Sequence, residues 1–403
     1  MKNRLLATLF LLALAGAARG TEPAPEEDLY LSALQAVAEG RHGDASAIVA
    51  RMIARGPSNA GEWLDLAMIQ CAVGHSAEAE ALFADIERRF SPQPGILNII
   101  AQQRAQGCHS AKPLSQWSLS AARGYDNNVN QGASNPYFSS GNGVPLELLP
   151  EYQPRADQFS VLAGDYTREL GQNGDIGYVQ VHLRQNDRVA DYNTAALFAG
   201  AEHPWRWGRW KLRSSGLLGV LTLGGALYQQ QVQAQLRATP PLVLPEPYDF
   251  SVQGSLSRTH YRTLSNFDAT TLEVRATLGY HDDHSLAQAS AGALYDQGDR
   301  QRPGGDRSGW SLRLLARTVL TTKLQGEVDW SYQHWRGQAD YSPGLIDITR
   351  RQNTNTVRTT LIYALSATQA LQLEGRWVRN RENISIFQYD SRQLQLTWRW
   401  YGQ

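Results

Sequence analysis

The fold is decided by residues 115–131, SQWSLSAARGYDNNVNQ, where a helical period in the preceding residues gives way to a two-residue alternation. Trp117, Leu119 and Ala121 fall on one face of an alternating strand. The Asx-rich segment at 126–130 ends this strand, because short polar side chains cap the backbone and tolerate turns. Together with the alternation that follows, the stretch predicts the first strand of a membrane barrel.

The N-terminus has the layout of a secretory signal peptide. A positive start at residues 2–4 is followed by an apolar run at 5–14 and a small-residue tail that ends at Gly20. We expect cleavage after Gly20, so that residues 1–20 are removed; cleavage after Ala17 is the alternative. The chain is therefore predicted to be exported.

The composition is compatible with a β-barrel membrane protein. The formal net charge is +0 at pH 7, which argues against nucleic acid as a partner. After the signal peptide, no run approaches the roughly 18 consecutive apolar residues that a spanning helix needs. A mean hydropathy of −0.42 resembles that of a soluble protein. The 11 Trp and 17 Tyr nevertheless suit a barrel, whose strands turn only one face to lipid.

Residues 21–110 are predicted to form an α-helical tetratricopeptide-repeat domain. At an offset of about 34 residues, the length of such a repeat, the chain aligns Leu29 with Trp63 and Leu97, and Ala33 with Ala67 and Ala101. We predict two full repeats and a third first helix, Pro94 to Gln106, that acts as a cap. Stacked repeats usually bind a peptide or protein partner, and a structural plug or spacer is the alternative.

Both cysteines of the chain, Cys71 and Cys108, fall in the helical part. An even number of cysteines in an exported protein predicts a disulfide. The repeat register places the two residues on adjacent first helices, where a bridge between them is geometrically reasonable. Two buried free thiols are the alternative.

Residues 115–403 are predicted to form an antiparallel transmembrane β-barrel of about 14 strands, an even number as bacterial barrels require. In one clear segment, Leu272, Val274 and Ala276 alternate with Glu273 and Arg275. Segments with this period lie near 115–125, 157–169, 175–187, 191–203, 210–222, 226–238, 248–262, 267–281, 285–297, 308–320, 323–336, 354–365, 370–381 and 390–402.

The lengths of the connections predict the orientation of the barrel, since such barrels have short periplasmic turns and long outer loops. If the helical domain is periplasmic, every second connection should be short, as at 171–175, 206–209, 281–284, 321–322 and 366–369. Long outer loops are expected at 130–154, 298–307, 337–353 and 382–389. The Pro-rich segment TPPLVLPEP at 239–247 is the exception. It is either a periplasmic element or a sign that the neighbouring strands are miscounted.

The inward face of the predicted strands carries charged residues of both signs. The candidate lumen-lining residues are Glu273, Arg275, Glu327, Asp329, Arg358, Glu374, Arg376 and Arg399. One interpretation is a lattice of salt bridges that stabilises or plugs the barrel; the other is a passage for a polar polypeptide. A porin for small ions of one sign would more often have a constriction of a single charge sign.

The motifs of common enzymes are missing from this sequence. It contains no GxSxG, phosphate loop or HExxH. The segment that begins at Asp126 superficially resembles a calcium loop, but Gln131 stands where glycine is needed and Tyr137 where glutamate is needed. We therefore predict no enzyme activity, no cofactor and no metal site.

The segment GYDNNVN at 124–130 resembles the first-strand motif of the surface lipoprotein assembly modulator family, Slam. The matching residues are Gly124, Tyr125, Asp126, Asn128, Val129 and Asn130. A repeat domain before the barrel, and the strand count, agree with this family. The resemblance implies a periplasmic repeat domain followed by a fourteen-stranded barrel in the outer membrane.

The resemblance also implies a function as a translocator. Such a protein delivers a client, either a surface lipoprotein or a secreted haem- or metal-binding protein, from the periplasm to the cell surface. The other implied partners are the outer-membrane lipid bilayer and the barrel-assembly machinery, to which Trp398 and Trp400 offer an aromatic last strand. The alternatives are a passive outer-membrane conduit, such as an exopolysaccharide export porin, and an outer-membrane enzyme, such as a lipid hydrolase.

Overall fold

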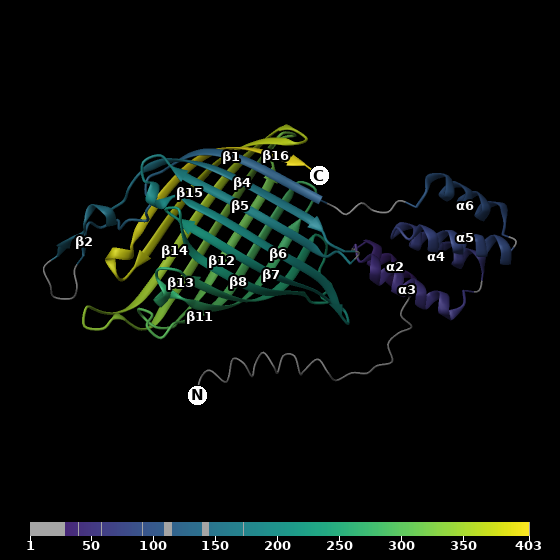
Figure 1. The fold of residues 1–403 in the computed structure, drawn as a ribbon, viewed down its shortest axis with the longest axis horizontal. Helices are drawn as coiled ribbons and strands as arrows, with labels where there is room; N and C mark the ends of the chain where they lie inside the picture. Colours follow the sequence, from purple (N-terminus) through teal and green to yellow (C-terminus); the bar gives the residue numbers. More distant parts are fainter. Residues whose placement is uncertain are drawn as a thin grey trace. The chain divides into compact units, whose positions relative to one another are not determined.

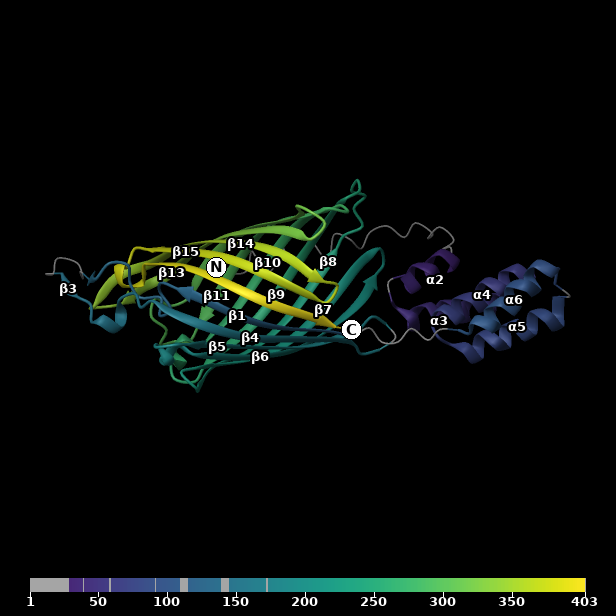
Figure 2. The ribbon, with the colours of Figure 1, turned by 90° about the horizontal axis from the view of Figure 1, so that it is seen from above.

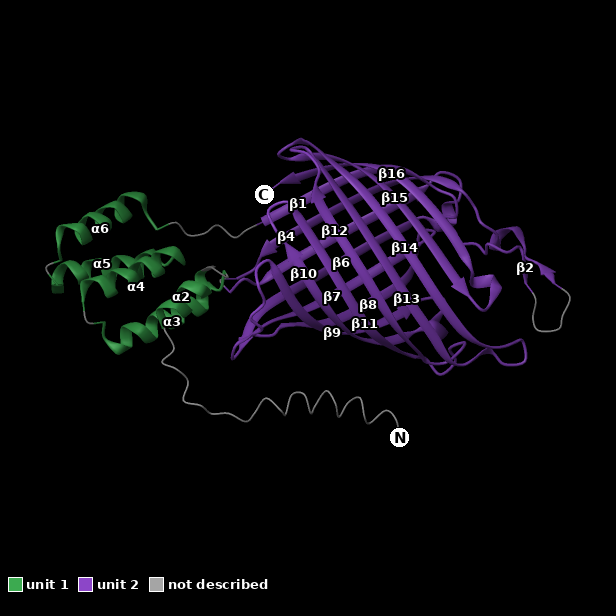
Figure 3. Cartoon of the chain, turned by 180° about the vertical axis from the view of Figure 1, so that it is seen from behind, with its two compact units in different colours: residues 1–112 green, residues 113–403 purple. Residues whose placement is uncertain are grey.

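The computed structural model describes residues 29–38, 40–57, 59–90, 92–108, 115–138, 145–171 and 173–402. The chain divides into two compact units, residues 1–112 and 113–403 (Figure 3). The predicted signal peptide at 1–20 lies outside the described residues.

Within the described residues the first unit contains five helices (Figure 1): α2 (Leu29–Ala38), α3 (His42–Arg55), α4 (Ala60–Ala72), α5 (Ser76–Phe90) and α6 (Pro94–Gln106). Helix α2 packs against α3, and α4 packs against α5. Local signals set the helix ends: the Asn59 side chain accepts the Glu62 N–H at 3.0 Å, and Gly56 ends α3 with a φ of 75°. Helices α2 to α5 are paired in sequence order, and α6 contacts α4. Their assignment to the tetratricopeptide class stays a prediction.

Small and large apolar residues form the core of the helical unit. Ala33 and Ala67 are fully buried, and Leu66 and Phe83 fill the space between the helices. Leu97 on α6, which aligns with Leu29 and Trp63 at the repeat offset, is 40% exposed. No described helix covers that face. No helix among the described residues is long and apolar enough to cross a membrane.

The second unit is a closed antiparallel barrel of fourteen strands in the described residues, and the predicted fold class is confirmed. In chain order the strands are β1 (Ser115–Asp126), β4 (Asp157–Glu169), β5 (Ile176–Asn186), β6 (Thr194–Trp207), β7 (Trp210–Leu223), β8 (Ala226–Thr239), β9 (Tyr248–Tyr261), β10 (Ala269–His281), β11 (Ser285–Gly298), β12 (Arg307–Val319), β13 (Leu324–Ser342), β14 (Ile346–Ser366), β15 (Gln369–Glu382) and β16 (Tyr389–Gly402). Each strand pairs with its neighbour in the chain, and β1 pairs with β16.

The two ends of the barrel differ in their connections. We name one end of the barrel the turn end. Its connections are 170–175, 208–209, 240–247, 282–284, 320–323 and 367–368. We name the opposite end the loop end, and its connections are 127–156, 187–193, 224–225, 262–268, 299–306, 343–345 and 383–388. The first loop contains the two-residue strands β2 (Tyr137–Phe138) and β3 (Leu146–Glu147), which lie beyond the barrel strands (Figures 1 and 2).

The Pro-rich segment at 239–247 does not reflect a miscount of the strands around it. Its residues 240–247 form the connection between β8 and β9 at the turn end.

The predicted outer loop at 337–353 is wrong, because most of these residues extend β13 and β14 into a longer hairpin. Pairing continues beyond Arg336, with register shifts, as far as Ser342 opposite Ile346. Arg350 secures the hairpin by donating two hydrogen bonds to the buried Glu382 carboxylate, at 2.6 and 2.7 Å. The central Pro343 and Gly344, typical of loops, hide this extension from a reading of periodicity.

The outer surface of the barrel is apolar and has aromatic residues toward both ends. Leu119, Leu218 and Leu272 are exposed on it, by 49%, 61% and 49%. Tyr248 and Tyr280 pair near the turn end with ring centroids 5.4 Å apart, and Trp310 and Tyr332 pair toward the loop end at 4.9 Å. This distribution suits a bilayer, since aromatic residues favour its two interfaces.

Replacing Leu66, which is 1% exposed, with alanine should destabilise the helical unit by about 3 kcal/mol, because the truncation leaves a cavity in its core. We expect a lower urea midpoint for the helical signal in far-ultraviolet circular dichroism of the detergent-solubilised chain. The matched variant Leu97→Ala should change the stability by no more than about 0.5 kcal/mol. Equal effects of the two substitutions would contradict this packing.

Candidate functional site at the barrel seam and in the lumen

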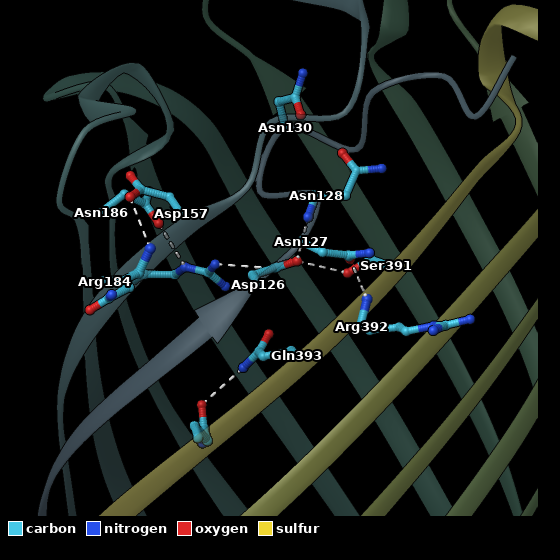
Figure 4. A network of polar contacts seen from close by, with 12 residues as sticks. Asp126, Asn127, Asn128, Asn130, Asp157, Arg184, Asn186, Ser391, Arg392 and Gln393 are labelled. Carbon is cyan, nitrogen blue, oxygen red and sulfur yellow. Dashed lines mark hydrogen bonds and ion pairs between the residues drawn. The ribbon is translucent and has the colours of Figure 1, made fainter.

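The motif residues of the first strand lie at the seam, which we define as β1 with its two neighbours β16 and β4 (Figure 4). Strand β1 pairs with β16 from Trp117 opposite Gly402 to Asp126 opposite Gln393. On its other edge, Asp126 lies opposite Asp157, the first residue of β4. The motif is thus at the loop end of the place where the barrel closes.

Asp126 connects three strands of the barrel. Its side chain is buried, and one carboxylate oxygen lies 3.2 Å from Nη2 of Arg184 on β5. The other oxygen accepts hydrogen bonds from Ser391 Oγ on β16 at 3.0 Å and from the Asn128 N–H at 2.9 Å. Arg184 also lies over the Phe159 ring, 4.0 Å from its centroid. One carboxylate therefore holds β1, β5 and β16 together and begins the turn that follows β1.

Asn128 binds the backbone of the first loop. The residue is 1% exposed, and its amide nitrogen donates to the carbonyls of Gly132 and Asp390, each at 3.0 Å. Its amide oxygen accepts the Gly132 N–H at 2.7 Å. Gly132 is buried and Asp390 half-buried, and both lie beyond the last pair of β1 with β16. The asparagine therefore supplies hydrogen-bond partners that this strand pairing does not.

The other motif residues also have identifiable contacts. Asn130 donates to the carbonyls of Glu151 and Gln153 at 3.0 and 2.8 Å, which closes the far part of the same loop. Val129 donates its N–H to the Arg155 carbonyl at 2.9 Å. The segment that resembles a calcium loop is thus engaged in turn and loop bonds. No cluster of three or more His, Cys, Asp or Glu suited to a metal occurs in the described part of the chain.

Gly124 and Tyr125 face opposite sides of the wall. A Cβ atom at Gly124 would lie 2.4 Å from Cζ of Phe159 and 2.8 Å from the carbonyl oxygen of Leu394. Only glycine fits this position without displacing the neighbouring strands. Tyr125 is 49% exposed on the outer surface.

A further ion pair links β1 to the loop at 187–193. Arg123 Nη1 lies 2.8 Å from Oδ1 of Asp187, and both side chains are largely exposed. The hydrogen bond from Arg123 holds the pKa of Asp187 below its usual range. The contribution of this pair to stability is therefore present above the usual carboxyl pKa, and it is lost as the pH falls through the lowered value. Exposure to solvent keeps the contribution small.

The eight predicted lumen residues occupy inward-facing positions in the strand register. They lie on β10, β13, β14, β15 and β16, where they alternate with exposed residues such as Leu272, Val328, Leu361 and Leu373. Glu273 and Arg275 bind each other on β10, with Nε of Arg275 donating at 2.9 Å. The others gather on the wall formed by β13 to β16.

Asp329 is the centre of the charged wall. It accepts hydrogen bonds from Arg358 at 2.6 Å and from Arg313 at 2.8 and 3.0 Å. Glu327 accepts two from Arg317, at 2.8 and 2.5 Å. Arg313 and Arg317, on β12, are missing from the predicted set, although their alternation with Leu312 and Leu314 would have revealed them.

Three predicted lumen residues are not part of a described ion pair. Glu374 lies between Thr360 and Gln395 on the neighbouring strands, and Arg376 lies between Arg358 and Gln393. The guanidinium carbon of Arg399 lies 6.0 Å from the Tyr401 ring centroid.

Another part of the wall is polar but nearly free of charge. Strand β8 presents a row of inward-facing glutamines, and β9 presents Ser251, Gln253, Ser255 and Ser257 on the same side. The row on β8 consists of Gln229, Gln231, Gln233 and Gln235, and the next inward position is Arg237, opposite Gln253. The lumen therefore has one wall with charges of both signs, partly paired, and another rich in amides and hydroxyls.

In the helical unit, Cys71 and Cys108 form a disulfide with sulfurs 2.09 Å apart. The bridge ties the end of α4 to the residues just after α6. Arg104 of α6 adds a second link between helices, since it donates to Glu80 and Glu87 of α5. These two carboxylates raise the pKa of Arg104 above its ordinary value.

Comparison with known proteins finds outer-membrane barrels of distant sequence among the solved structures. No protein-family model matches the chain, and no curated protein matches it significantly. Among solved structures it resembles OmpT, an outer membrane protein of Vibrio cholerae (in-vitro folded; 6% identity, TM-score 0.40, 72% of this chain and 98% of that one). It also resembles an anion-selective porin from Comamonas acidovorans (10%, 0.39, 72% and 99%) and the channel DcaP of Acinetobacter baumannii (9%, 0.41, 72% and 97%). Similarity at this level says nothing about function, and the Slam resemblance stays a prediction.

Replacing Asn128 with alanine should loosen the first loop, because it leaves the Gly132 N–H and the Asp390 carbonyl without their partner. Each unsatisfied buried group costs about 1–3 kcal/mol. We expect faster chymotryptic cleavage within 133–154 in the detergent-solubilised protein. Asn135→Ala removes only an exposed local bond to the Tyr137 N–H and should leave the cleavage rate unchanged. Equal rates for both variants would contradict the role of Asn128.

Replacing Asp329 with asparagine should make the lumen more selective for anions, since Arg313 and Arg358 lose the charge that balances them. The measurement is the reversal potential of the protein in planar bilayers under a potassium chloride gradient. Asp283→Asn removes the same charge from an exposed turn outside the lumen and serves as the control. A reversal potential that is identical in the two variants would refute a conducting lumen lined by Asp329.

Proposed function

We propose that this protein is an outer-membrane translocator, which delivers a client protein from the periplasm to the cell surface. The client class suggested by the first-strand motif is a surface lipoprotein or a secreted haem- or metal-binding protein. In this proposal the barrel spans the outer membrane and gives the client its route, while the helical unit engages the client in the periplasm. The protein makes and breaks no covalent bond.

The apolar outer surface and the asymmetry of the connections support this location. Strand β1 begins at the turn end, where Ser115 lies opposite Arg168 near the end of β4. Short turns characterise the periplasmic end of bacterial barrels. The helical unit directly precedes β1 in the chain, so a periplasmic turn end would put this unit in the periplasm as well.

The observation that carries the proposal is the mixed charge of the lumen. Asp329 is bound by Arg313 and Arg358, and Glu327 is bound by Arg317. A polypeptide in transit presents both signs of charge together with backbone amides. A wall that carries charges of both signs, together with a wall of amides and hydroxyls, can exchange hydrogen bonds with such a chain. A one-sign constriction would favour small ions instead.

The helical unit exposes apolar residues at its surface. Leu97 and Ile99 on α6 are 40% and 44% exposed, and Leu34 on α2 is 40% exposed. Exposed apolar residues on a repeat-like unit suit contact with a peptide or protein. We assign Leu97 and Ile99 to the contact with the client.

The second candidate is a passive conduit, such as an exopolysaccharide export porin. The glutamine and serine rows of β8 and β9 favour it, because amides and hydroxyls form hydrogen bonds with sugar hydroxyls as readily as with a peptide backbone.

The decisive experiment compares intact cells with and without this gene. A candidate client is a small secreted or lipid-anchored protein encoded beside it, and its surface exposure is measured by protease shaving. Loss of exposure with accumulation of the candidate in the periplasm supports translocation. Unchanged exposure, together with altered release of a glycan or small solute, supports the conduit and rejects the translocator.

Replacing Leu97 and Ile99 together with aspartate should abolish capture of this client by the purified full-length chain, because both substitutions put charge into the proposed contact. The control Asn98→Asp with Gln102→Asp adds the same two charges at exposed positions of the same helix. We expect a pull-down signal with the control and none with the first variant. Retention of the client by both variants would remove α6 from the proposal.

A further inference from the structure

The loop end of the lumen contains a cavity that none of the functions considered above requires. Its volume is about 210 Å³, and it lies between strands β9 to β14 and the loop at 299–306. Tyr261, Asp296, Arg302, Arg307, Trp335 and Arg350 are among the residues that line it. An apolar cavity of about 150 Å³ accepts a benzene ring, so this cavity has room for a phosphate group or a six-membered sugar ring.

The charges around the cavity do not balance. Arg302 Nη2 and Arg307 Nε both donate to the same oxygen of Asp296, at 2.9 and 2.5 Å. The other oxygen of Asp296 accepts Thr271 Oγ1 at 3.0 Å. Arg350 is neutralised by its two bonds to Glu382. Three guanidinium groups therefore share two carboxylates, and one positive charge is left over.

Arg302 also has a donor without a partner. Its side chain is only 7% exposed, and its Nη1 is buried without a hydrogen-bond partner among the described residues. A buried donor that lacks a partner loses its hydration without compensation. A buried unpaired charge is more unfavourable still. An oxyanion that accepts a hydrogen bond from Nη1 would supply the missing partner and also balance the extra positive charge.

The site is held in place by the surrounding backbone. The loop at 299–306 is fixed to the extended part of β13 by two backbone hydrogen bonds. The Ala339 N–H donates to the Gly304 carbonyl at 3.1 Å, and the Gln338 N–H donates to the Asp306 carbonyl at 2.8 Å. Arg307 lies over the Trp335 ring, 4.4 Å from its centroid. The guanidiniums are thus positioned before a ligand arrives, which favours binding.

We propose that this cavity is a binding site for a compact oxyanion, either a free phosphate or the carboxylate of a sugar acid, with Nη1 of Arg302 as its principal donor. The proposal does not depend on the translocator function, because binding is measured on the purified chain without a client.

The test uses the full-length protein in detergent micelles, in buffer free of phosphate and sulfate. The probes are inorganic phosphate, followed by line broadening in phosphorus NMR, and glucuronate, followed by saturation-transfer NMR. We expect saturable binding that weakens about tenfold or more in Arg302→Met, as loss of a charged hydrogen bond predicts. Arg300→Met removes an exposed arginine from the same loop and should bind like the wild type.

A second variant keeps the test valid if Arg302→Met does not fold, as judged by heat-modifiable mobility on gels. Arg302→Lys keeps the charge but loses the planar fork, so its affinity should lie between those of the wild type and Arg302→Met. Tighter binding of phosphate than of glucuronate identifies the free anion as the ligand, and the reverse order identifies a sugar acid. Absence of saturable binding of both probes, or equal binding by the wild type and the Arg302 variants, overturns the proposal.

Discussion

Backbone pairing between β1 and β16 is the interaction on which the barrel depends. Inside a bilayer no water is available to replace a missing hydrogen bond, so an open sheet edge would leave a row of unsatisfied amides. Pairing from Trp117 to Asp126 removes that edge. Where the ladder ends, Asp126 and Asn128 continue it with side-chain bonds to Ser391 and to the Asp390 carbonyl. The contacts of the motif therefore stabilise the closed barrel, and any functional role of the motif depends on that closure.

Closure of the barrel also determines which side chains line its lumen. Because side chains alternate along each strand, the residues that turn away from lipid meet across a common lumen. The structure places carboxylates beside arginines there, as at Asp329, and arranges amides and hydroxyls along β8 and β9. A lumen built in this way is strongly polar and carries charges of both signs. At its loop end, three arginines share the carboxylates of Asp296 and Glu382.

The regular parts of the fold could be predicted from the sequence, and the irregular parts could not. Alternation located all fourteen strands, because one buried or lipid-facing side imposes a strict period. It failed at 337–353, where Pro343 and Gly344 at the tip mask a hairpin that Arg350 and Glu382 stabilise. It also identified Asp329 and Arg358 as lumen residues and marks Arg313 as inward-facing, but it does not show that Arg313 is the partner of Asp329. Pairing across strands depends on register, which a single strand does not contain. The same applies to Asp296, whose partners Thr271 and Arg307 lie on the two neighbouring strands.

The seam also has a consequence for the order of folding. Asp126 and Ser391 are 265 residues apart in the chain, whereas every other pair of adjacent barrel strands is joined by a single connection. Joining such distant ends carries the largest loop-closure entropy in the barrel, and contacts of this kind form late. Until then β1 and β16 are two free edges that could pair with other chains. The nascent protein therefore needs protection at both edges for as long as its last strand is unfinished, and its first strand must wait the longest for its partner.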